Sequence, residues 1–428
     1  MRKTFCDLET RRELLKTNKK VLLKNTVMLY ILQFSAYFFS FITTPYQTRI
    51  MGPEIYGKIG YATAMMVYFQ LFLDFGFILS STADITRHRE DKPYISRLIT
   101  SVAFIKVIFT LLSLGVLLLL CFTMDSLRED MLLYLLYFAG VAVNTFIPDY
   151  LYRGLEHMSV LTIRTVIIKL AFTVLIFIFL REPSDYYVVP LLTLLGNLGS
   201  VIGVYIHMKK KMHIWFCRVS MREIWMHAKR ASTFFLSRIA TTIYSSTNTM
   251  LLGVIDPSKV SVGYYSSADK IVTMAKNGMS PISDSIYPYM ISNKDFKLIK
   301  KILLIFMPVI GAGCTVVYIF AEPLCTLFFG AEFAPTANVL RALLPVIFVT
   351  LPSYMLGFPT LSAVGLQKHA NYSIYAGCAV DLILLAVLFF TGHITAVTLG
   401  LTMSAAEITI LLYRIIVIIR NRELFRHH

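Results

Sequence analysis

The sequence predicts an all-α integral membrane protein with about 12 transmembrane helices, divided into two halves of six. Three observations predict this class. The chain has 428 residues, 56% of them hydrophobic and only 15% charged, with a mean hydropathy of +0.66. A soluble domain carries about 25% charged residues. Long apolar stretches recur along the whole chain, and the loops between them are alternately rich and poor in lysine and arginine.

Each apolar stretch reaches the roughly 20 residues that a helix needs to cross a bilayer. Backbone groups cannot stay unpaired in lipid, so these stretches are predicted to be helices, and their length excludes a β-barrel. The predicted spans are 26–50, 56–80, 95–123, 131–151, 159–180, 186–208, 228–255, 262–290, 298–321, 340–361, 370–391 and 395–419.

The distribution of cations predicts the orientation of the chain. Basic residues gather before residue 25, in 87–97, in 209–230, in 294–301 and after 420, whereas the intervening loops hold single cations at Arg128, Arg181 and Lys259. Cationic loops stay on the cytoplasmic side, so both termini are predicted to be cytoplasmic. The predicted organisation is a basic tail (1–25), an N-lobe (26–208), a basic cytoplasmic linker (209–227), a C-lobe (228–419) and a second tail (420–428).

The net charge of +16 does not indicate nucleic acid in this setting. The cations lie at predicted membrane boundaries, where acidic lipid headgroups attract them. Membrane lipids are therefore expected partners, and nucleic acid is not.

The two halves share a weak internal similarity. Gly52 and Gly57 of the first half match Gly253 and Gly263 of the second, each pair enclosing the turn between the first two helices of its half. Six helices per half give both halves the same orientation, which defines a parallel repeat about an axis along the membrane normal. Chance alignment of apolar sequence is the competing interpretation. In the sixth span, Gly199 and Gly203 form a GxxxG motif, which is typical of close helix contact.

Motifs for catalysis are not found. The run from Gly52 to Lys58 fits GxxxxGK, but Ile59 follows where a P-loop needs Ser or Thr, and both flanks are predicted membrane helices. ATP binding is therefore rejected. No HExxH, GxSxG or Cys/His metal-ligand spacing is present. We expect no catalytic residues, no metal, no cofactor and no enzymatic activity.

Charged residues inside the predicted spans are the main functional signal, because a charge in hydrocarbon costs at least about 2.5–3.5 kcal/mol and must face a cavity or a partner. The candidates for a substrate cavity are Arg49, Lys106, Lys169, Arg238, Lys270 and Lys276. The candidates for ion coupling, or for pairing with those cations, are Asp269, Asp381 and Glu407. A pathway in which cations outnumber anions would attract an anionic substrate. Snorkelling of Arg49 and Lys106 to headgroups, and structural ion pairing for the others, stay open.

Prolines within the spans are candidate hinges. Pro45 in the first span and Pro281 in the eighth each remove a backbone hydrogen bond. Either residue could bend its helix during transport or simply fix a static kink.

Two stretches carry a resemblance to a known family. Phe329-Gly330-Ala331-Glu332-Phe333-Ala334-Pro335-Thr336-Ala337, followed by Leu340-Arg341-Ala342-Leu343 and Pro345, resembles a signature of polysaccharide exporters. Thr48-Arg49-Ile50-Met51-Gly52-Pro53, Asp74-Phe75-Gly76 and the run from Leu361 to Lys368 are similar to weaker patterns of the same family. The chain thus resembles Wzx-type flippases of the multidrug/oligosaccharidyl-lipid/polysaccharide exporter superfamily.

The resemblance implies two pseudo-symmetric six-helix lobes around a central cavity that opens alternately to each side. It implies a bacterial cytoplasmic (inner) membrane protein that moves an undecaprenyl-diphosphate-linked oligosaccharide, such as an O-antigen unit, to the outer leaflet. Expected partners are the lipid-linked oligosaccharide and, as an open question, a polysaccharide polymerase and chain-length machinery. Of the candidate cations, only Arg49 falls on a family motif.

Two other functions compete with this interpretation. A cation-coupled multidrug antiporter of the same superfamily would need a net acidic cavity. A polytopic glycan polymerase or ligase would need a large outward loop with catalytic residues, and the outward loops here are short.

Overall fold

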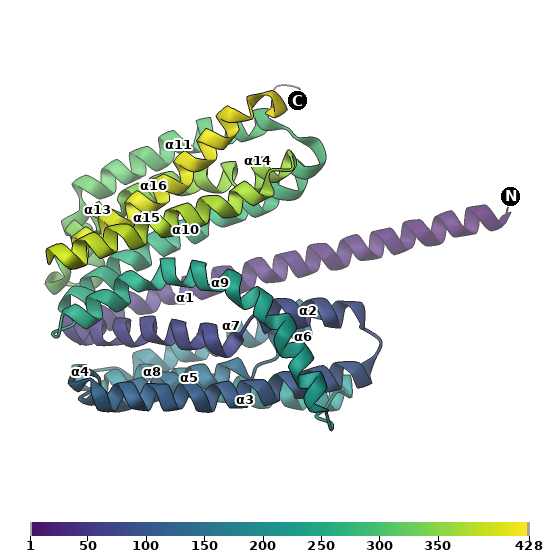
Figure 1. The fold of residues 1–428 in the computed structure, drawn as a ribbon, viewed down its shortest axis with the longest axis horizontal. Coiled ribbons are helices and arrows are strands. Elements are labelled where there is room, and N and C mark those ends of the chain that lie inside the picture. The colour runs from purple at the N-terminus through teal and green to yellow at the C-terminus, as the bar shows by residue number, and fades with distance from the viewer. Residues whose placement is uncertain (1, 426–428) are drawn as a thin grey trace. The chain divides into compact units, whose positions relative to one another are not determined.

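A computed structural model describes the backbone of residues 2–425, and the side chains of that range except 2–26, 29, 33, 36, 236–238, 240, 241, 243–245 and 288. The described chain is mostly helical and contains no strand, which confirms the predicted all-α class (Figure 1). In chain order, the elements are α1 (Arg2–Asp74), α2 (Phe77–Arg87), α3 (Lys92–Thr123), α4 (Asp125–Arg128), α5 (Met131–Thr145), α6 (Asp149–Gly154), α7 (Met158–Phe179), η1 (Pro183–Tyr187), α8 (Val188–His207), η2 (Met208–Met212), α9 (Met221–Ile255), α10 (Val260–Asn293), α11 (Phe296–Ile319), α12 (Ala321–Phe329), η3 (Ala331–Phe333), α13 (Thr336–Leu356), α14 (Phe358–Ala363), α15 (Gln367–Thr391), α16 (Ala396–Arg420) and η4 (Arg422–Phe425).

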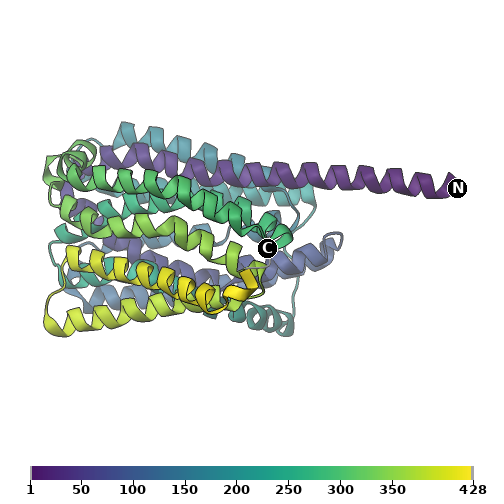
Figure 2. The same cartoon turned by 90° about the horizontal axis from the view of Figure 1, so that it is seen from above.

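The chain divides into two compact units. The first unit holds residues 1–43, 69–179 and 187–236, and the second holds 44–68, 180–186 and 237–428. Within the first unit, α8 packs against α5 and α7, and within the second, α16 packs against α13 and α15. The yellow-green helices α15 and α16 of the second unit lie side by side in both views (Figure 2).

Nine helical segments of the described residues are long and apolar enough to cross a membrane. One of them, Tyr30–Arg87, covers residues 30–50 of the first predicted span and all of the second. The predicted spans 228–255 and 262–290 lie within the long helices α9 and α10 but do not belong to the nine. Eight side chains of the first of these spans lie outside the described residues, and serine is frequent in the second, for example at Ser266, Ser267 and Ser280. The number of crossings, twelve, therefore stays a prediction.

Helix α1 bends at Gly52, where the backbone has φ 67° and ψ 175°. A positive φ of this size is sterically costly for any residue with a Cβ atom, so glycine is the natural residue at the bend. Pro53 follows directly and removes one backbone donor from the next turn. The GxxxxGK run is thus a kink between two helical segments, in accord with the rejection of a phosphate-binding loop.

Two of the four glycines of the proposed repeat, Gly57 and Gly263, lie at one contact inside the second unit. A Cβ atom on Gly57 would lie 1.8 Å from the carbonyl oxygen of Lys259, and one on Gly263 would lie 2.1 Å from that of Pro53. Gly57 and Gly263 are 206 positions apart, and so are Pro53 and Lys259, so the two contacts are reciprocal. A two-fold relation between the two segments produces this pattern, and it favours the repeat over chance alignment.

The GxxxG motif of α8 has no comparable contact. Nothing among the described residues lies within 4 Å of a Cβ placed on Gly199 or Gly203. The prediction of close helix packing at this motif is therefore wrong for contacts within the described chain. Side chains at these two positions would meet open space.

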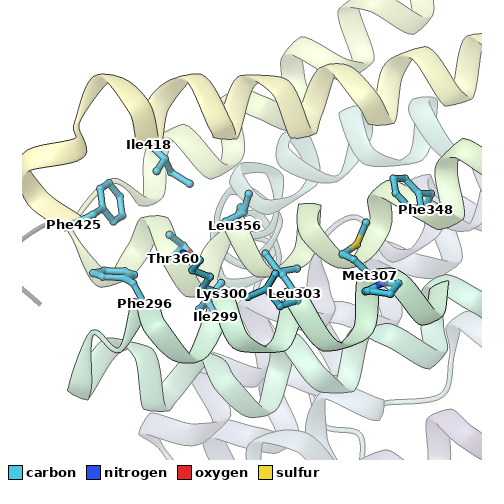
Figure 3. Close-up of a pocket in the computed structure, with 12 residues that line it drawn as sticks. Phe296, Ile299, Lys300, Leu303, Met307, Phe348, Leu356, Thr360, Ile418 and Phe425 are labelled. Carbon is cyan, nitrogen blue, oxygen red and sulfur yellow. The ribbon is translucent and has the colours of Figure 1, made fainter. Parts of the chain in front are cut away.

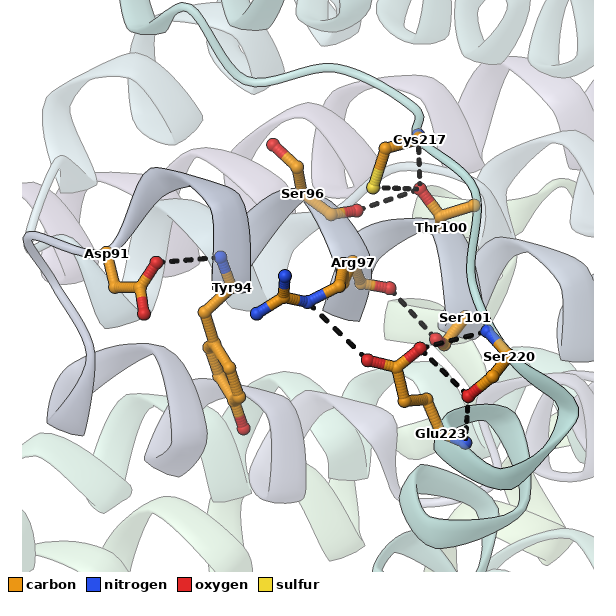
Figure 4. A network of polar contacts seen from close by, with 9 residues as sticks. All are labelled: Asp91, Tyr94, Ser96, Arg97, Thr100, Ser101, Cys217, Ser220 and Glu223. Carbon is orange, nitrogen blue, oxygen red and sulfur yellow. Dashed lines mark hydrogen bonds and ion pairs between the residues drawn. The ribbon is translucent and has the colours of Figure 1, made fainter.

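The basic linker is anchored to the first unit by the polar network in Figure 4. Ser220 and Glu223 form a capping box at the start of α9, with Ser220 N donating to Glu223 Oε2 at 2.9 Å and Glu223 N donating to Ser220 Oγ at 3.3 Å. The hydrogen bonds that this carboxylate accepts from Ser220, first from the backbone N and then from Oγ at 3.1 Å, lower the pKa of Glu223. The same carboxylate lies 3.5 Å from Arg97 Nε, and Cys217 N donates to Thr100 Oγ1 of α3 at 3.1 Å.

Apolar residues of the linker strengthen this anchor. Met212, Ile214 and Ile224 are all buried in the core cluster of the first unit. The linker therefore packs as part of that unit, although its high charge alone would suggest a solvated loop.

A buried histidine at the end of the linker predicts a pH-dependent stability. His227 is 5% exposed and lies 3.8 Å from Asp84, which Arg230 also binds at 3.2 Å. Burial lowers the pKa of His227, against the opposing effect of Asp84. The unfolded chain then binds the proton more readily, so stability should fall as the pH drops through about 6.5 and should be unaffected by this group above it. The melting temperature of the purified protein should fall between pH 7.5 and pH 5, and His227→Gln should make that fall smaller.

Replacement of the exposed linker residue His213 by Gln is the matched control and should leave the pH profile unchanged. An equal slope in the His227→Gln protein and in the native protein would contradict the assignment to His227.

Candidate functional site

Lys106 is held deep inside the first unit. It is 3% exposed on α3, and its ammonium group donates to the carbonyl oxygen of Thr145 and lies 5.7 Å from the ring centre of Tyr150. Asp74 and Asp149 lie close enough to interact with its charge. This cation has partners and does not reach headgroups, so snorkelling does not describe it.

Lys169 lines a cavity of about 300 Å³ between α5, α7 and α8 of the first unit. Arg164 lies one and a half turns earlier on α7 and lines the same cavity, together with the amide side chains of Asn144 and Asn197. Arg164 Nη2 donates to Asp149 at 3.1 Å, but its buried Nη1 atom has no hydrogen-bond partner among the described residues. No ion pair with Lys169 is found in the described part of the chain. The cavity therefore offers two cationic groups with unused donors.

Arg49 and Lys270 occupy polar positions in the second unit. The exposed Arg49 donates through Nη2 to the carbonyl oxygen of Leu327, in the last turn of α12. Such a contact satisfies a helix end that lacks an internal partner. Lys270 Nζ lies 3.3 Å from Thr44 Oγ1 and 5.7 Å from the ring centre of Tyr56.

Lys276 and Glu407 form an ion pair at 2.5 Å between α10 and α16. Glu407 also lines a cavity of about 350 Å³ with Arg414 and Asp284. Arg414 is 5% exposed, and its guanidinium donates to both Ser353 and Ser373. The sequence left open whether Glu407 couples an ion or pairs with an internal cation, and the structure pairs it with Lys276.

Asp269 and Asp381 have different surroundings. Asp269 hydrogen-bonds to Thr273, one turn later on α10, so it and its neighbour Lys270 have separate partners. Asp381 is 1% exposed on α15 and lies close to Thr402 and Asn248, while its Oδ1 atom has no hydrogen-bond partner within the described residues. A buried carboxylate oxygen without a donor is the feature expected where a proton or a small cation binds.

The remaining candidates are placed less fully. The side chain of Arg238 lies outside the described residues. Pro45 lies within α1, seven residues before the bend at Gly52, and Pro281 lies within α10. Their roles as hinges stay predictions.

Sequence reasoning missed two arginines that line cavities, the partly buried Arg164 and the buried Arg414. Both fall inside predicted spans, 159–180 and 395–419, so the signal of a charge within an apolar stretch was present. What the sequence could not show was that the two side chains point to neighbouring helices of the same unit rather than to headgroups.

The described residues contain no group of three or more His, Cys, Asp and Glu side chains that could hold a metal ion. The five cysteines whose side chains are described are free thiols. The two cavities that hold candidate residues, one in each unit, are thus lined in part by cations, hydroxyls or amides, which can bind and orient a charged group.

Many apolar helices and charged internal cavities together define a multi-pass helical membrane protein. A family model described as "Polysaccharide biosynthesis protein" matches residues 22–294. The chain belongs to this polysaccharide biosynthesis family.

Two curated proteins are similar along most of their length, and both carry the name "Putative O-antigen transporter". The one from Escherichia coli K12 is 26% identical over 380 residues, covering 87% of this chain and 91% of the relative. The one from Shigella dysenteriae is 26% identical over 326 residues, covering 75% of this chain and 81% of the relative.

Solved structures share the fold. The lipid II flippase MurJ in an inward closed conformation matches with a TM-score of 0.68 at 13% identity, over 94% of this chain and 89% of that one. An inward-facing multidrug resistance MATE transporter of the MOP superfamily matches with a TM-score of 0.65 at 14% identity, over 94% and 98% of the two chains. At these identities the similarity shows the fold alone.

Proposed function

We propose that this protein is a flippase for a lipid-linked oligosaccharide, such as the repeat unit of an O-antigen or of another surface polysaccharide. The substrate would pass from the inner to the outer leaflet of a bacterial cytoplasmic membrane by alternating access. The observation that carries the proposal is the 26% identity, over 87% of the chain, to the Escherichia coli protein named "Putative O-antigen transporter". The proposal includes the lobes 26–208 and 228–419 and cytoplasmic termini, which the alternation of basic loops supports.

The internal charges fit an anionic substrate. A lipid-linked oligosaccharide carries its negative charge on the diphosphate and on any acidic sugar. In the cavity between α5, α7 and α8, Lys169 and the free Nη1 of Arg164 can donate to phosphate or carboxylate oxygens. Asn144 and Asn197 line the same space, although Asn197 already donates to Gly140 at 2.9 Å. We assign this cavity as a subsite for the anionic part of the substrate.

A multidrug antiporter is the second candidate, since MATE transporters share the fold. A drug antiporter binds cations and needs unpaired carboxylates. Asp381 alone offers a buried carboxylate oxygen without a partner among the described residues, while Glu407 is neutralised by Lys276. Asp381 is better suited to ion coupling than to drug binding. The proposal includes no enzymatic activity, and a polymerase and chain-length machinery stay proposed partners.

The deciding experiment uses the purified full chain in proteoliposomes that contain a polyprenyl-diphosphate oligosaccharide with a fluorescent sugar. A membrane-impermeant quencher or glycosidase reports transfer between leaflets. We expect transfer above that of protein-free vesicles, and its response to sodium and pH gradients tests coupling. No transfer under any gradient, together with export of cationic dyes, would favour the antiporter.

Substitution of Lys169 tests the anion subsite. Lys169→Gln should reduce transport about tenfold or more, because a hydrogen bond between charged groups contributes about 1.5–3 kcal/mol. Abundance and thermal stability should change little, since no ion pair with Lys169 is found in the described chain. The assay is initial flipping rate per folded protein. Lys92→Gln, at the exposed start of α3, is the matched control. Equal rates in the Lys169→Gln and Lys92→Gln proteins would remove Lys169 from the site.

A further inference from the structure

The second unit has an apolar groove that the proposed transport does not use. It lies between α11, α13, α14, α16 and η4 and has a volume of about 640 Å³. Pockets of this size hold drug-sized ligands. Figure 3 shows α11 along one side and Ile418 and Phe425, from the C-terminal part of the chain, facing it.

One face of α11 lines the groove along its length. The lining residues of this helix recur at the spacing of a single helical stripe. They are Phe296, Ile299, Lys300, Leu303, Leu304, Met307 and Pro308. The stripe covers twelve residue steps, which is about 18 Å. This length is close to the roughly 15 Å of hydrocarbon in one leaflet.

The groove carries one charge, near one end. Lys300 is the only charged residue among those that line it, and the hydroxyl of Thr360 is already bonded to the carbonyl oxygen of Met355 at 2.7 Å. The rings of Phe296 and Phe425, with centres 5.0 Å apart, lie at this end. The two adjoining segments, 294–301 and 420–425, hold six cations and two carboxylates. A ligand with an apolar chain and an anionic head fits this arrangement.

We propose that the groove binds an acidic phospholipid of the adjoining leaflet, with one acyl chain along the α11 stripe and the phosphate at Lys300. Basic pockets between membrane helices are known to select anionic headgroups. The match to the thickness of one leaflet favours an acyl chain over a polyprenyl chain, which is several times longer. This site is separate from the proposed substrate subsite, which lies in the other unit.

The test measures contact between groove and lipid directly. Trp215 and Trp225 are the only tryptophans of the chain, so a variant with both replaced by Phe has no tryptophan fluorescence. Met307→Trp then places a single tryptophan in the groove. Val309→Trp places one on the opposite side of α11, where Val309 is 67% exposed. The protein is reconstituted with brominated phosphatidylglycerol or brominated phosphatidylcholine, and quenching of the reporter is compared.

We expect brominated phosphatidylglycerol to quench the Met307→Trp reporter with about fivefold higher apparent affinity, because one cation near the surface contributes about that factor. The Val309→Trp reporter should show no such preference. Lys300→Ala should abolish the preference, while Lys301→Ala, the next cation of α11 and outside the groove lining, should keep it. Gel filtration confirms that each variant is folded.

Three results would overturn the proposal. One is equal quenching by the two lipids at position 307, and another is equal loss of preference in Lys300→Ala and Lys301→Ala. The third is displacement of the brominated phosphatidylglycerol by polyprenyl phosphate at lower concentration than by unlabelled phosphatidylglycerol, which would assign the groove to the tail of the transported lipid.

Discussion

Reversal of the charge at Lys276 is expected to destabilise the protein severely. Lys276→Glu would place a second carboxylate beside Glu407, at a position where the ammonium now lies 2.5 Å from it. Breaking a fully buried ion pair by removal of one partner costs about 3–5 kcal/mol. This pair, with side chains 20% and 8% exposed, should approach that range once the repulsion between the two carboxylates is added. The membrane-inserted abundance and the melting temperature of the purified protein should both fall. A role in the substrate cavity alone, for which Lys276 was a candidate, would predict loss of transport at normal abundance, and the pairing with Glu407 changes that expectation.

Two further variants test whether loss of the ion pair is the cause of the lower stability. Lys270→Glu, six positions earlier on α10, replaces a lysine that contacts the hydroxyl of Thr44 and the ring of Tyr56, and should cost less. The exchange Lys276→Glu with Glu407→Lys restores opposite charges and should recover part of the abundance, although the nearby Arg414 disfavours a cation at 407. If transport then stays absent at restored abundance, Lys276 also contacts the substrate. A Lys276→Glu protein as abundant and stable as the native one would contradict the structural role.

The second large effect is expected at the reciprocal glycine contact. Gly57→Ala would bring a methyl group to 1.8 Å from the carbonyl oxygen of Lys259, and Gly263→Ala would bring one to 2.1 Å from that of Pro53. The obstacle in both cases is backbone, which cannot rotate away, so the helices must separate. Overpacking typically costs 1–3 kcal/mol and sometimes more. Each variant should lower the melting temperature, and the double variant should cost less than the sum, because both act at one interface.

Gly203→Ala is the matched control for these variants, because nothing among the described residues lies within 4 Å of the added atom. It should leave the melting temperature unchanged or raise it slightly, since alanine is the better helix former. Equal melting temperatures for Gly57→Ala and Gly203→Ala would show that the contact between the two segments does not form in the folded protein.

The charged residues show how much of the candidate site could be predicted from the sequence. A lysine or glutamate in an apolar stretch must have a partner or a cavity, so Lys106, Lys169, Lys276 and Glu407 could be selected as candidates from sequence alone. Their partners could not be selected, since Thr145 and Glu407 are 39 and 131 positions away from the lysines they meet. The arginines Arg164 and Arg414 carried the same sequence signal, and only the cavities around them distinguish them from headgroup anchors.

Properties that depend only on each residue's own preference for lipid or water can be predicted from the sequence. Hydropathy, helix length and the alternation of basic loops follow from the solvent that each residue prefers, so the sequence by itself determined a multi-spanning helical membrane protein and the places of its charged residues. The tertiary structure alone decided the Lys276–Glu407 pair, the reciprocal contact of Gly57 and Gly263 and the groove on α11. These features depend on which helix faces join, and the packing of side chains from distant segments fixes those faces.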